Sequence, residues 1–181
     1  MPVYLHLAEG FEEIEAITVI DLLRRAEIEV ETVSLRGRLN VTGSHGIELI
    51  ADIVFEDAVY DHCDMIILPG GGRGCENLAA HDGLRDKLYS FANTGRKIAA
   101  ICAAPSVVLG PLGILDGKKA TCYPDMDDGM EGATPCMDDV VVDGNIITSR
   151  AAGTTIPFAL AIIENLKGRK AADNVAGKIL Y

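Results

Sequence analysis

Cys102 is the residue of this sequence with the clearest chemical potential, because it stands where a strand pattern gives way to a helix pattern. Residues 97–101 have the apolar character of a buried strand, and residues 103–109 combine small side chains with a proline suited to the first turn of a helix. A thiol at such a turn faces helix N–H groups and the positive end of the helix dipole, both of which favour an anion. The pattern predicts a nucleophilic cysteine with a lowered pKa.

A packing role is the alternative for Cys102, since free cysteines are commonly buried and inert. The neighbouring segments favour chemistry. Residues 8–16 carry four glutamates where the first expected strand meets the first expected helix, and residues 68–72 place three glycines after another strand. A nucleophile, an acid or base and a row of backbone N–H donors are the parts of a cysteine-dependent catalytic site.

Glu15 is one of four candidates for the acid or base, together with Glu9, Glu12 and Glu13. Glutamates near a helix start usually serve the helix dipole and face solvent. Glu15 lies deeper in the helix pattern, between two apolar residues, so partial burial is expected. Burial would raise the pKa of this carboxyl and keep it protonated, able to donate to a thiolate or an oxidised sulfur.

The glycine-rich segment 70–74 has two further interpretations. It could bind phosphate, but it lacks the Lys-Ser/Thr pair of a P-loop and fits the dinucleotide fingerprint poorly. It could also be a tight turn that needs positive φ. We favour an oxyanion hole beside the cysteine, because glycines let backbone N–H groups come close to the reacting atoms.

The expected elements alternate between strands and helices. Strands are expected at 3–8, 28–35, 63–68 and 98–101, helices at 13–26, 82–93 and 153–166, and hairpins around 43–46 and 143–145. This order predicts an α/β fold with a mainly parallel central sheet and helices on both faces. Ligands of such sheets bind beyond the carboxyl ends of the strands, where the three segments above should meet.

Composition narrows the function classes. The chain has 181 residues and a formal net charge of -11, which predicts one domain over residues 1–181 and disfavours nucleic acid and anionic membranes as partners. No transmembrane run or basic leader is present, and five cysteines without a C-x-x-C pair predict neither a disulfide framework nor a zinc site. A cytoplasmic location is expected. The acidic run 125–129 departs from a calcium loop, so no metal is expected.

Five segments together make the sequence resemble the ThiJ/PfpI superfamily, in particular the branch of the parkinsonism-associated protein deglycase. They are AEGFEEIE at 8–15, DLLRRA at 21–26, LPGG at 68–71, IAAICAAP at 98–105 and TSRAAGT at 148–154. The resemblance implies a flavodoxin-like three-layer sandwich with Cys102 in a strained nucleophile elbow and Glu15 as its protonated partner. It implies an anion pocket made by the N–H groups of Gly71 and Ala103, with Gly70, Tyr123 and Arg150 at the site rim.

The resemblance also implies a function. Relatives in this branch are linked to cofactor-free, glyoxalase- or deglycase-type conversion of small reactive carbonyls such as methylglyoxal, or of glycated proteins. They are equally linked to oxidation sensing and chaperone activity, so both classes stay open. A homodimer built on the apolar first helix is expected.

One departure concerns Tyr123, which occupies the place of a histidine in that branch. Tyrosine is a poor proton acceptor at neutral pH, which disfavours a Cys–His dyad and glutamine-amidotransferase-like chemistry. Cys122 beside it is the best candidate for a second reactive thiol, although a packing role is favoured.

Overall fold

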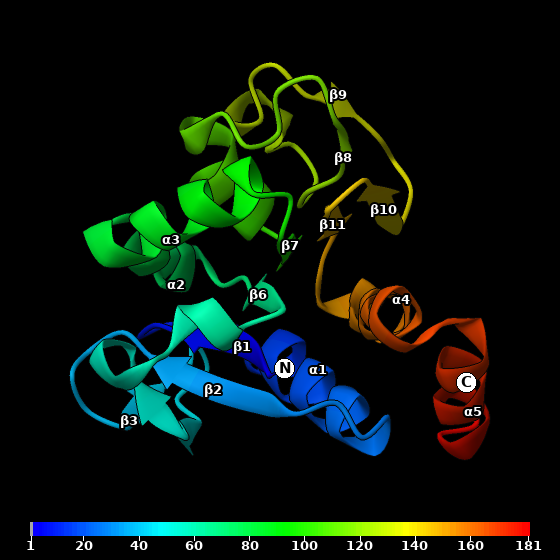
Figure 1. Cartoon of the computed structure of the whole chain (residues 1–181). Coiled ribbons are helices and arrows are strands. Elements are labelled where there is room, and N and C mark those ends of the chain that lie inside the picture. Colours follow the sequence, from blue (N-terminus) through cyan, green and yellow to red (C-terminus); the bar gives the residue numbers. More distant parts are fainter. Residues whose placement is uncertain (1) are drawn as a thin grey trace.

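A seven-stranded sheet forms the centre of the computed structural model, which describes residues 2–181 (Figure 1). All neighbouring strands are parallel except the pair at the β10 edge. From one edge to the other, the strands are β10 (Val140–Asp143), β11 (Ile146–Ser149), β7 (Lys97–Ile101), β6 (Met65–Leu68), β1 (Val3–Leu7), β2 (Val30–Ser34) and β5 (Ile53–Val54).

Helices cover both faces of this sheet, as Figure 1 shows. One face carries α2 (Gly72–Ala79) and α3 (Asp82–Asn93), and the other carries α1 (Glu13–Arg25), α4 (Thr155–Lys167) and α5 (Arg169–Lys178). Each central strand serves both layers because successive side chains point to opposite faces. In β6, Ile66 and Leu68 pack toward α2 and α3, whereas Met65 and Ile67 pack toward α1 and α4.

Two smaller sheets lie outside the central one. The expected hairpin is present, with β3 (Asn40–Thr42) antiparallel to β4 (Glu48–Ile50), and β8 (Lys119–Ala120) pairs with β9 (Thr134–Pro135). The hairpin turn is tied to the start of α1, because the Glu13 carboxylate accepts the backbone N–H of His45 at 2.7 Å and the Ser44 hydroxyl at 3.1 Å. Burial alone would raise the pKa of Glu13, but its hydrogen bonds with His45 lower it to about 2.

The segment after Cys102 differs from the predicted helix. It forms a π-helical turn over Pro105–Leu109 and a 3-10 turn over Gly110–Leu112. Gly110 packs directly on the Gly129 backbone, so the turn is shaped by tertiary contact more than by helix propensity. The helices α2 and α5 were not expected, because α2 contains two glycines and α5 is short and mainly polar. Within residues 2–181, no helix combines the length and apolarity needed to cross a bilayer.

Candidate active site

Cys102 occupies a strained turn at the carboxyl end of β7. Its φ is 65°, in the left-handed region that costs a non-glycine residue about 1 kcal/mol or more. Two hydrogen bonds hold this conformation: the Cys102 N–H donates to the Ser149 carbonyl at 3.0 Å, and the Cys102 carbonyl accepts from the Tyr123 N–H at 2.8 Å. The turn is therefore clamped by two segments remote in sequence, and it presents the half-buried sulfur above the sheet edge.

Glu15 reaches the Cys102 sulfur from the first turns of α1. The side chain is almost completely buried, and its Oε2 accepts the Gly70 N–H at 2.7 Å. The Cys102 thiol beside this carboxyl opposes part of the rise that burial causes in the pKa of Glu15. A Cβ on Gly70 would lie 2.6 Å from the Cys102 Cβ and closer still to Glu15 Oε2. The missing side chain of Gly70 is what allows the carboxylate and the thiol to meet.

Desolvation sets the protonation of both acidic groups, so the protonated Glu15 expected from the resemblance is present only below about pH 7, and above it the proton resides on the Cys102 thiol. Burial raises the pKa of Glu15 to about 7. Burial, followed by the nearby Glu15 carboxylate, raises the pKa of Cys102 to about 12, although hydrogen bonds from the Ala103 and Gly71 N–H groups oppose the change. The lowered thiol pKa expected from the sequence is wrong in direction, because desolvation outweighs the N–H donors. Above pH about 7 the pair holds one proton, and Glu15 can accept it from the thiol.

The other glutamates of the acidic run have different partners. Glu12 caps α1 by accepting the Glu15 N–H at 2.9 Å. Glu13 holds the hairpin turn, and Glu9 pairs with Arg36 and Arg38 at 3.2 and 2.9 Å. Glu12, Glu13 and His45 also place possible metal-ligand atoms within 4.8 Å of one another, but hydrogen bonds already occupy both Glu13 oxygens.

The expected rim residues occupy different places around the sulfur. Gly71, the residue before α2, has a φ of 93°, and its N–H and that of Ala103 lower the pKa of Cys102 and so favour the thiolate. Tyr123 donates its N–H to the Cys102 carbonyl, and the residue is 47% exposed. Arg150 follows the residue that accepts the Cys102 N–H, but its guanidinium donates to the Met137 carbonyl at 3.0 Å. Arg150 thus braces the neighbouring loop.

Two supporting residues were missed by sequence reasoning. The Ser149 hydroxyl is fully buried, donates to the Asp139 carbonyl at 2.7 Å and lies 2.7 Å from the Thr154 hydroxyl. The Thr154 oxygen accepts the Arg150 and Ala151 N–H groups at 3.2 and 3.1 Å. This network shapes the turn that receives the Cys102 N–H. Both residues belong to the segment TSRAAGT at 148–154, but the sequence does not show that this segment binds the Cys102 backbone.

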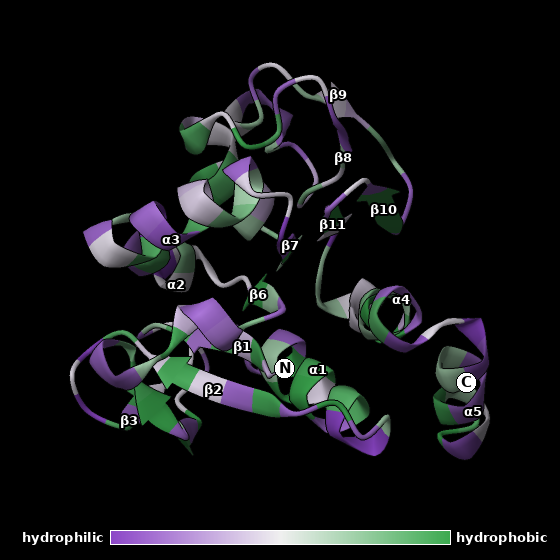
Figure 2. Cartoon of the chain, viewed as in Figure 1, coloured by the Kyte–Doolittle hydropathy of each residue, from purple (hydrophilic) through white to green (hydrophobic). Residues whose placement is uncertain are grey.

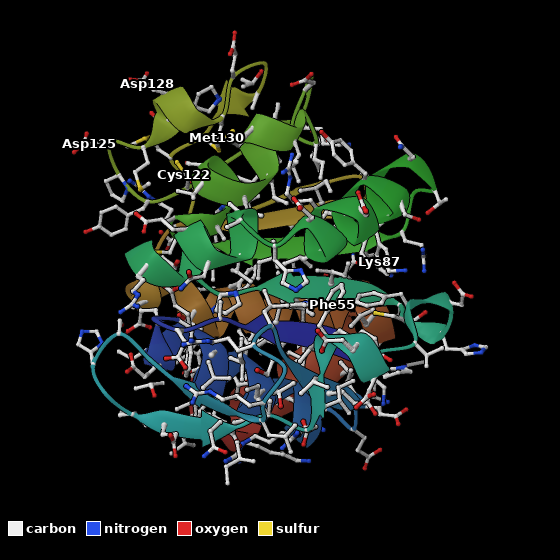
Figure 3. The ribbon with its side chains drawn as sticks, turned by 90° about the vertical axis from the view of Figure 1, so that its left-hand side faces the viewer. Phe55, Lys87, Cys122, Asp125, Asp128 and Met130 are labelled. Carbon is white, nitrogen blue, oxygen red and sulfur yellow. The ribbon has the colours of Figure 1, made fainter. Side chains whose placement is uncertain are left out.

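The remaining thiols have less access to solvent or acid–base partners. Cys63, Cys75 and Cys122 are buried, and burial raises the pKa of each. The Cys122 sulfur faces the Tyr123 carbonyl at 3.3 Å and Asp127 Oδ1 at 3.5 Å. Figure 3 shows Cys122 inside the loop whose Asp125 and Asp128 side chains point outward. Cys136 is half-exposed and is the natural competitor of Cys102 for small electrophiles.

We expect limiting iodoacetamide to label Cys102 before the other four thiols. The labelling rate should rise as the pH passes about 7, since Glu15 must be ionised to take the thiol proton. Peptide mass spectrometry of the labelled protein measures both effects. Cys136→Ser is the control for the most exposed competitor, and preferential labelling of Cys75 or Cys122 would contradict the assignment.

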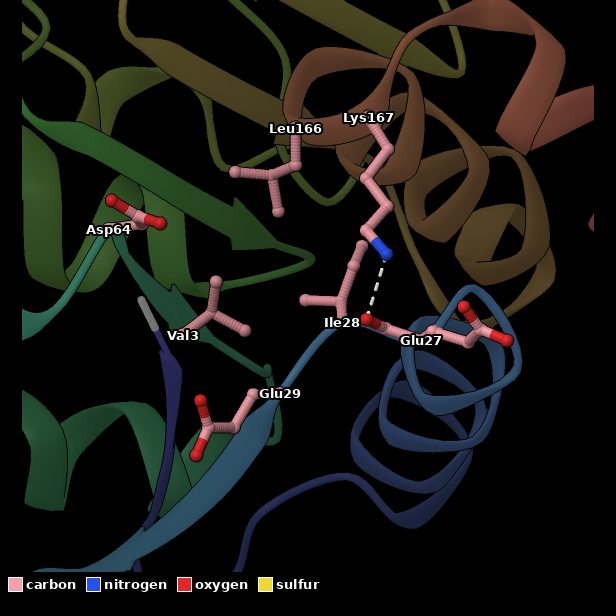
Figure 4. A pocket seen from close by; sticks show the side chains of 7 residues that line it. All are labelled: Val3, Glu27, Ile28, Glu29, Asp64, Leu166 and Lys167. Atoms are coloured by element: carbon pink, nitrogen blue, oxygen red, sulfur yellow. Dashed lines mark hydrogen bonds between the residues drawn. The ribbon is translucent and has the colours of Figure 1, made fainter.

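A separate cavity of about 360 Å³ lies at the amino ends of the strands, away from the carboxyl ends where Cys102 lies (Figure 4). Its lining includes Val3 at the start of β1 and Glu29 just before β2, and Lys167 closes one side by donating to the Glu27 carbonyl at 2.8 Å. Because these residues lie at the amino ends of the strands, the cavity is not part of the Cys102 site.

Comparison with known proteins gives consistent matches over most of the chain. Residues 1–165 match the model of the DJ-1/PfpI family. The DJ-1 homolog B of Arabidopsis thaliana is 41% identical over 164 residues, covering 91% of this chain and 37% of that protein. A glutathione-independent glyoxalase of Caenorhabditis elegans is 34% identical over 169 residues, covering 92% of this chain and 89% of that protein.

A solved structure of oxidized DJ-1 from Toxoplasma gondii is 37% identical, with a TM-score of 0.95 over 99% of this chain and 98% of that one. The chain spans only 37% and 42% of the length of two Arabidopsis thaliana relatives. The structural likeness confirms the predicted flavodoxin-like class, with a mainly parallel sheet between layers of helices.

Proposed function

The chain belongs to the DJ-1/PfpI family, and on that premise we propose that it is a cysteine-dependent, cofactor-free enzyme of glyoxalase or deglycase type. One observation carries the proposal: the buried Glu15 carboxyl and the Cys102 thiol meet at Gly70, and burial raises the pKa of Glu15 to about 7, so that it can act as an acid or a base near neutral pH. The glyoxalase name of the Caenorhabditis elegans relative supports the same chemistry. The proposed substrates are small reactive carbonyls such as methylglyoxal, or their adducts on glycated proteins.

The proposed reaction begins with attack of the Cys102 sulfur on the aldehyde carbon of methylglyoxal. Glu15 takes the thiol proton, and the resulting oxyanion is stabilised by the N–H groups of Gly71 and Ala103. Glu15 returns this proton to the oxyanion, which forms a neutral hemithioacetal and leaves Glu15 again as a carboxylate. Glu15 then moves the proton from the former aldehyde carbon to the neighbouring carbonyl carbon through an enediol, which gives a thioester. Water cleaves the thioester to lactate and restores the thiol, so the redox change is internal to the substrate.

Lactate formation from methylglyoxal by purified protein, without metal or glutathione, tests the proposal. We expect steady-state production over many turnovers by the unaltered chain and none by Cys102→Ser. Absence of turnover by the unaltered protein, with the fold verified by circular dichroism, would overturn the enzymatic function.

An oxidative sensor or redox-regulated chaperone is the second candidate. The half-buried sulfur faces Glu15 and two N–H donors, and the same groups can hold the oxygens of a sulfinate. The solved Toxoplasma gondii relative is described as oxidized. Peroxide titration followed by intact-mass measurement distinguishes this candidate, since a sensor accumulates Cys102 sulfinate while showing no carbonyl turnover.

We also propose that the chain forms a homodimer through α1 and the β3–β4 hairpin. Figure 2 shows hydrophobic stretches on α1, and β4 of the hairpin ends in Leu49 and Ile50. Ile14 is 55% exposed, Ile47 51% and Ile50 72%, so this face leaves much apolar surface in contact with water. A cavity between the two elements is lined in part by Ile17 and Ile50. A second copy of the same face would bury these side chains.

Light scattering across a dilution series should give twice the chain mass at micromolar concentration. Ile50→Lys should shift the species toward a monomer, because it places a charge in the buried contact. Val142→Lys is the matched control, since Val142 is 51% exposed on the far edge strand β10. A monomeric unaltered chain at micromolar concentration would contradict the dimer.

We also propose which partners the protein excludes and where in the cell it acts. The net charge of -11 disfavours nucleic acid and anionic membranes as partners. The cytoplasm is the proposed location, because a reduced Cys102 requires a reducing compartment.

A further inference from the structure

Another cavity lies beyond the carboxyl ends of β1 and β2, and neither Cys102 nor Glu15 lines it. Its volume is about 230 Å³, and its lining comes from the ends of both strands, from α2 and from the start of α3: Ala8, Glu9, Leu35, Arg36, Arg73, Asn77 and His81. Edges of this kind are where parallel α/β sheets bind ligands. The Cys102 reaction as derived above uses none of these side chains.

The charge of this cavity is opposite to that of the chain. Its single carboxylate, Glu9, is already engaged by Arg36 at 3.2 Å and Arg38 at 2.9 Å. Arg73 makes no ion pair among residues 2–181. The cavity thus holds an excess of positive charge in a protein whose formal net charge is -11.

The polar groups left over in the cavity are mainly hydrogen-bond donors. His81 Nδ1 accepts the Leu84 N–H at 3.1 Å, so in the neutral ring the proton resides on Nε2, which can donate. Guanidinium groups have donors only, whereas the Asn77 amide uses its Nδ2 on the Glu9 carbonyl at 2.8 Å and keeps its Oδ1 as an acceptor. Glu9 pairs with Arg36, and in the described part of the chain the positive charge of Arg73 stays unneutralised. A small cavity lined by hydrogen-bond donors suits a ligand whose polar atoms are hydrogen-bond acceptors.

We propose that this cavity binds a small phosphoryl anion, such as inorganic phosphate or a phosphate monoester of a few carbons. Two guanidiniums and an imidazole N–H suit the tetrahedral oxygens of a phosphoryl group, because arginine recognises such oxygens with paired hydrogen bonds. The volume admits a group of this size and excludes a dinucleotide. The site is separate from the Cys102 sulfur, and Arg73 is positioned by its neighbour Gly74, whose N–H donates to the Gly10 carbonyl at 3.1 Å.

Titration of the full-length chain with inorganic phosphate tests this site, using calorimetry and amide NMR shifts at constant ionic strength set by chloride. We expect saturable binding with shifts concentrated at Gly10, Arg73, Asn77 and His81. Arg73→Ala should weaken binding by about tenfold or more, the scale of a charge-assisted hydrogen-bonded contact. Arg85→Ala is the matched control, because Arg85 is an exposed arginine of α3 paired with Asp82 outside the cavity.

His81→Asn provides a second variant that should fold, since asparagine keeps an N-cap acceptor for α3 but lacks the imidazole N–H. It should weaken phosphate binding, and Cys102→Ser should leave it unchanged. Three results would overturn the proposal: no saturable binding to the unaltered chain, equal affinity in Arg73→Ala, or loss of binding in Cys102→Ser, which would place the anion at the sulfur. Equal binding of acetate would contradict the phosphoryl assignment. None of these outcomes depends on lactate formation.

Discussion

Replacement of Glu15 by glutamine should lower methylglyoxal turnover by about two to four orders of magnitude, the usual scale for loss of a general acid–base group. The amide can still accept the Gly70 N–H that Glu15 Oε2 accepts at 2.7 Å, so the shape of the site is kept. It cannot take the thiol proton or carry a proton between substrate carbons. Initial rates of lactate formation at saturating methylglyoxal measure the effect.

The pH profile of the unaltered enzyme gives an independent signature of Glu15. Its pKa is raised by burial to about 7, so the carboxylate needed to accept the thiol proton accumulates as the pH rises through that value. The rate should increase over the same window, and Glu15→Gln should lose this inflection. Oxidation of Cys102 to sulfinate should change much less in Glu15→Gln, since an amide can still donate to sulfinate oxygens. Glu15→Asp withdraws the carboxyl by one methylene and should impair both processes.

Stability measurements separate this chemical effect from unfolding. A carboxyl whose folded-state pKa is raised stabilises the fold below its unfolded pKa of about 4.5, and that stability is lost as the pH rises through about 7. At pH 8 the buried charge should cost on the order of 3 kcal/mol, and Glu15→Gln should recover part of it. Glu12→Gln is the matched control on the same helix end. Full turnover in Glu15→Gln together with loss in Glu12→Gln would show that the other carboxylate acts.

Gly70→Ala should reduce turnover by about a hundredfold or more. The new Cβ would lie 2.6 Å from the Cys102 Cβ and would press on Glu15, so the two groups must separate. A shift of about 1 Å between reacting groups is enough for a loss of this size. Lactate formation and the iodoacetamide labelling rate of Cys102 measure the separation, since both depend on proton transfer to Glu15.

Gly72→Ala is the matched control for this change, because a Cβ on Gly72 meets nothing within 4 Å. It should keep turnover within about twofold of the unaltered chain, as expected for a surface substitution. If Gly70→Ala and Gly72→Ala had the same turnover, the close contact between Glu15 and Cys102 would not matter for the reaction.

Much of the architecture could be predicted from local pattern. The strand 98–101 and the helix 82–93 agree with β7 and α3 to within one residue, because the apolar periodicity of each is strong and turn residues bound it. The helix after Cys102 and the helices α2 and α5 were predicted poorly. In these segments local propensity is weak, and contacts such as Gly110 on the Gly129 backbone decide the conformation.

The sequence by itself determined the α/β class and the convergence of the Glu-rich, Gly-rich and Cys102 segments, since both follow from the order of periodic segments and the rule for parallel sheets. The tertiary structure alone decided which glutamate meets the thiol, because Glu15, Gly70 and Cys102 come from three separate elements. It also decided the direction of the Cys102 pKa shift. Burial depends on packing across the whole fold, and here desolvation is stronger than the local N–H donors that the sequence pattern brings to the sulfur.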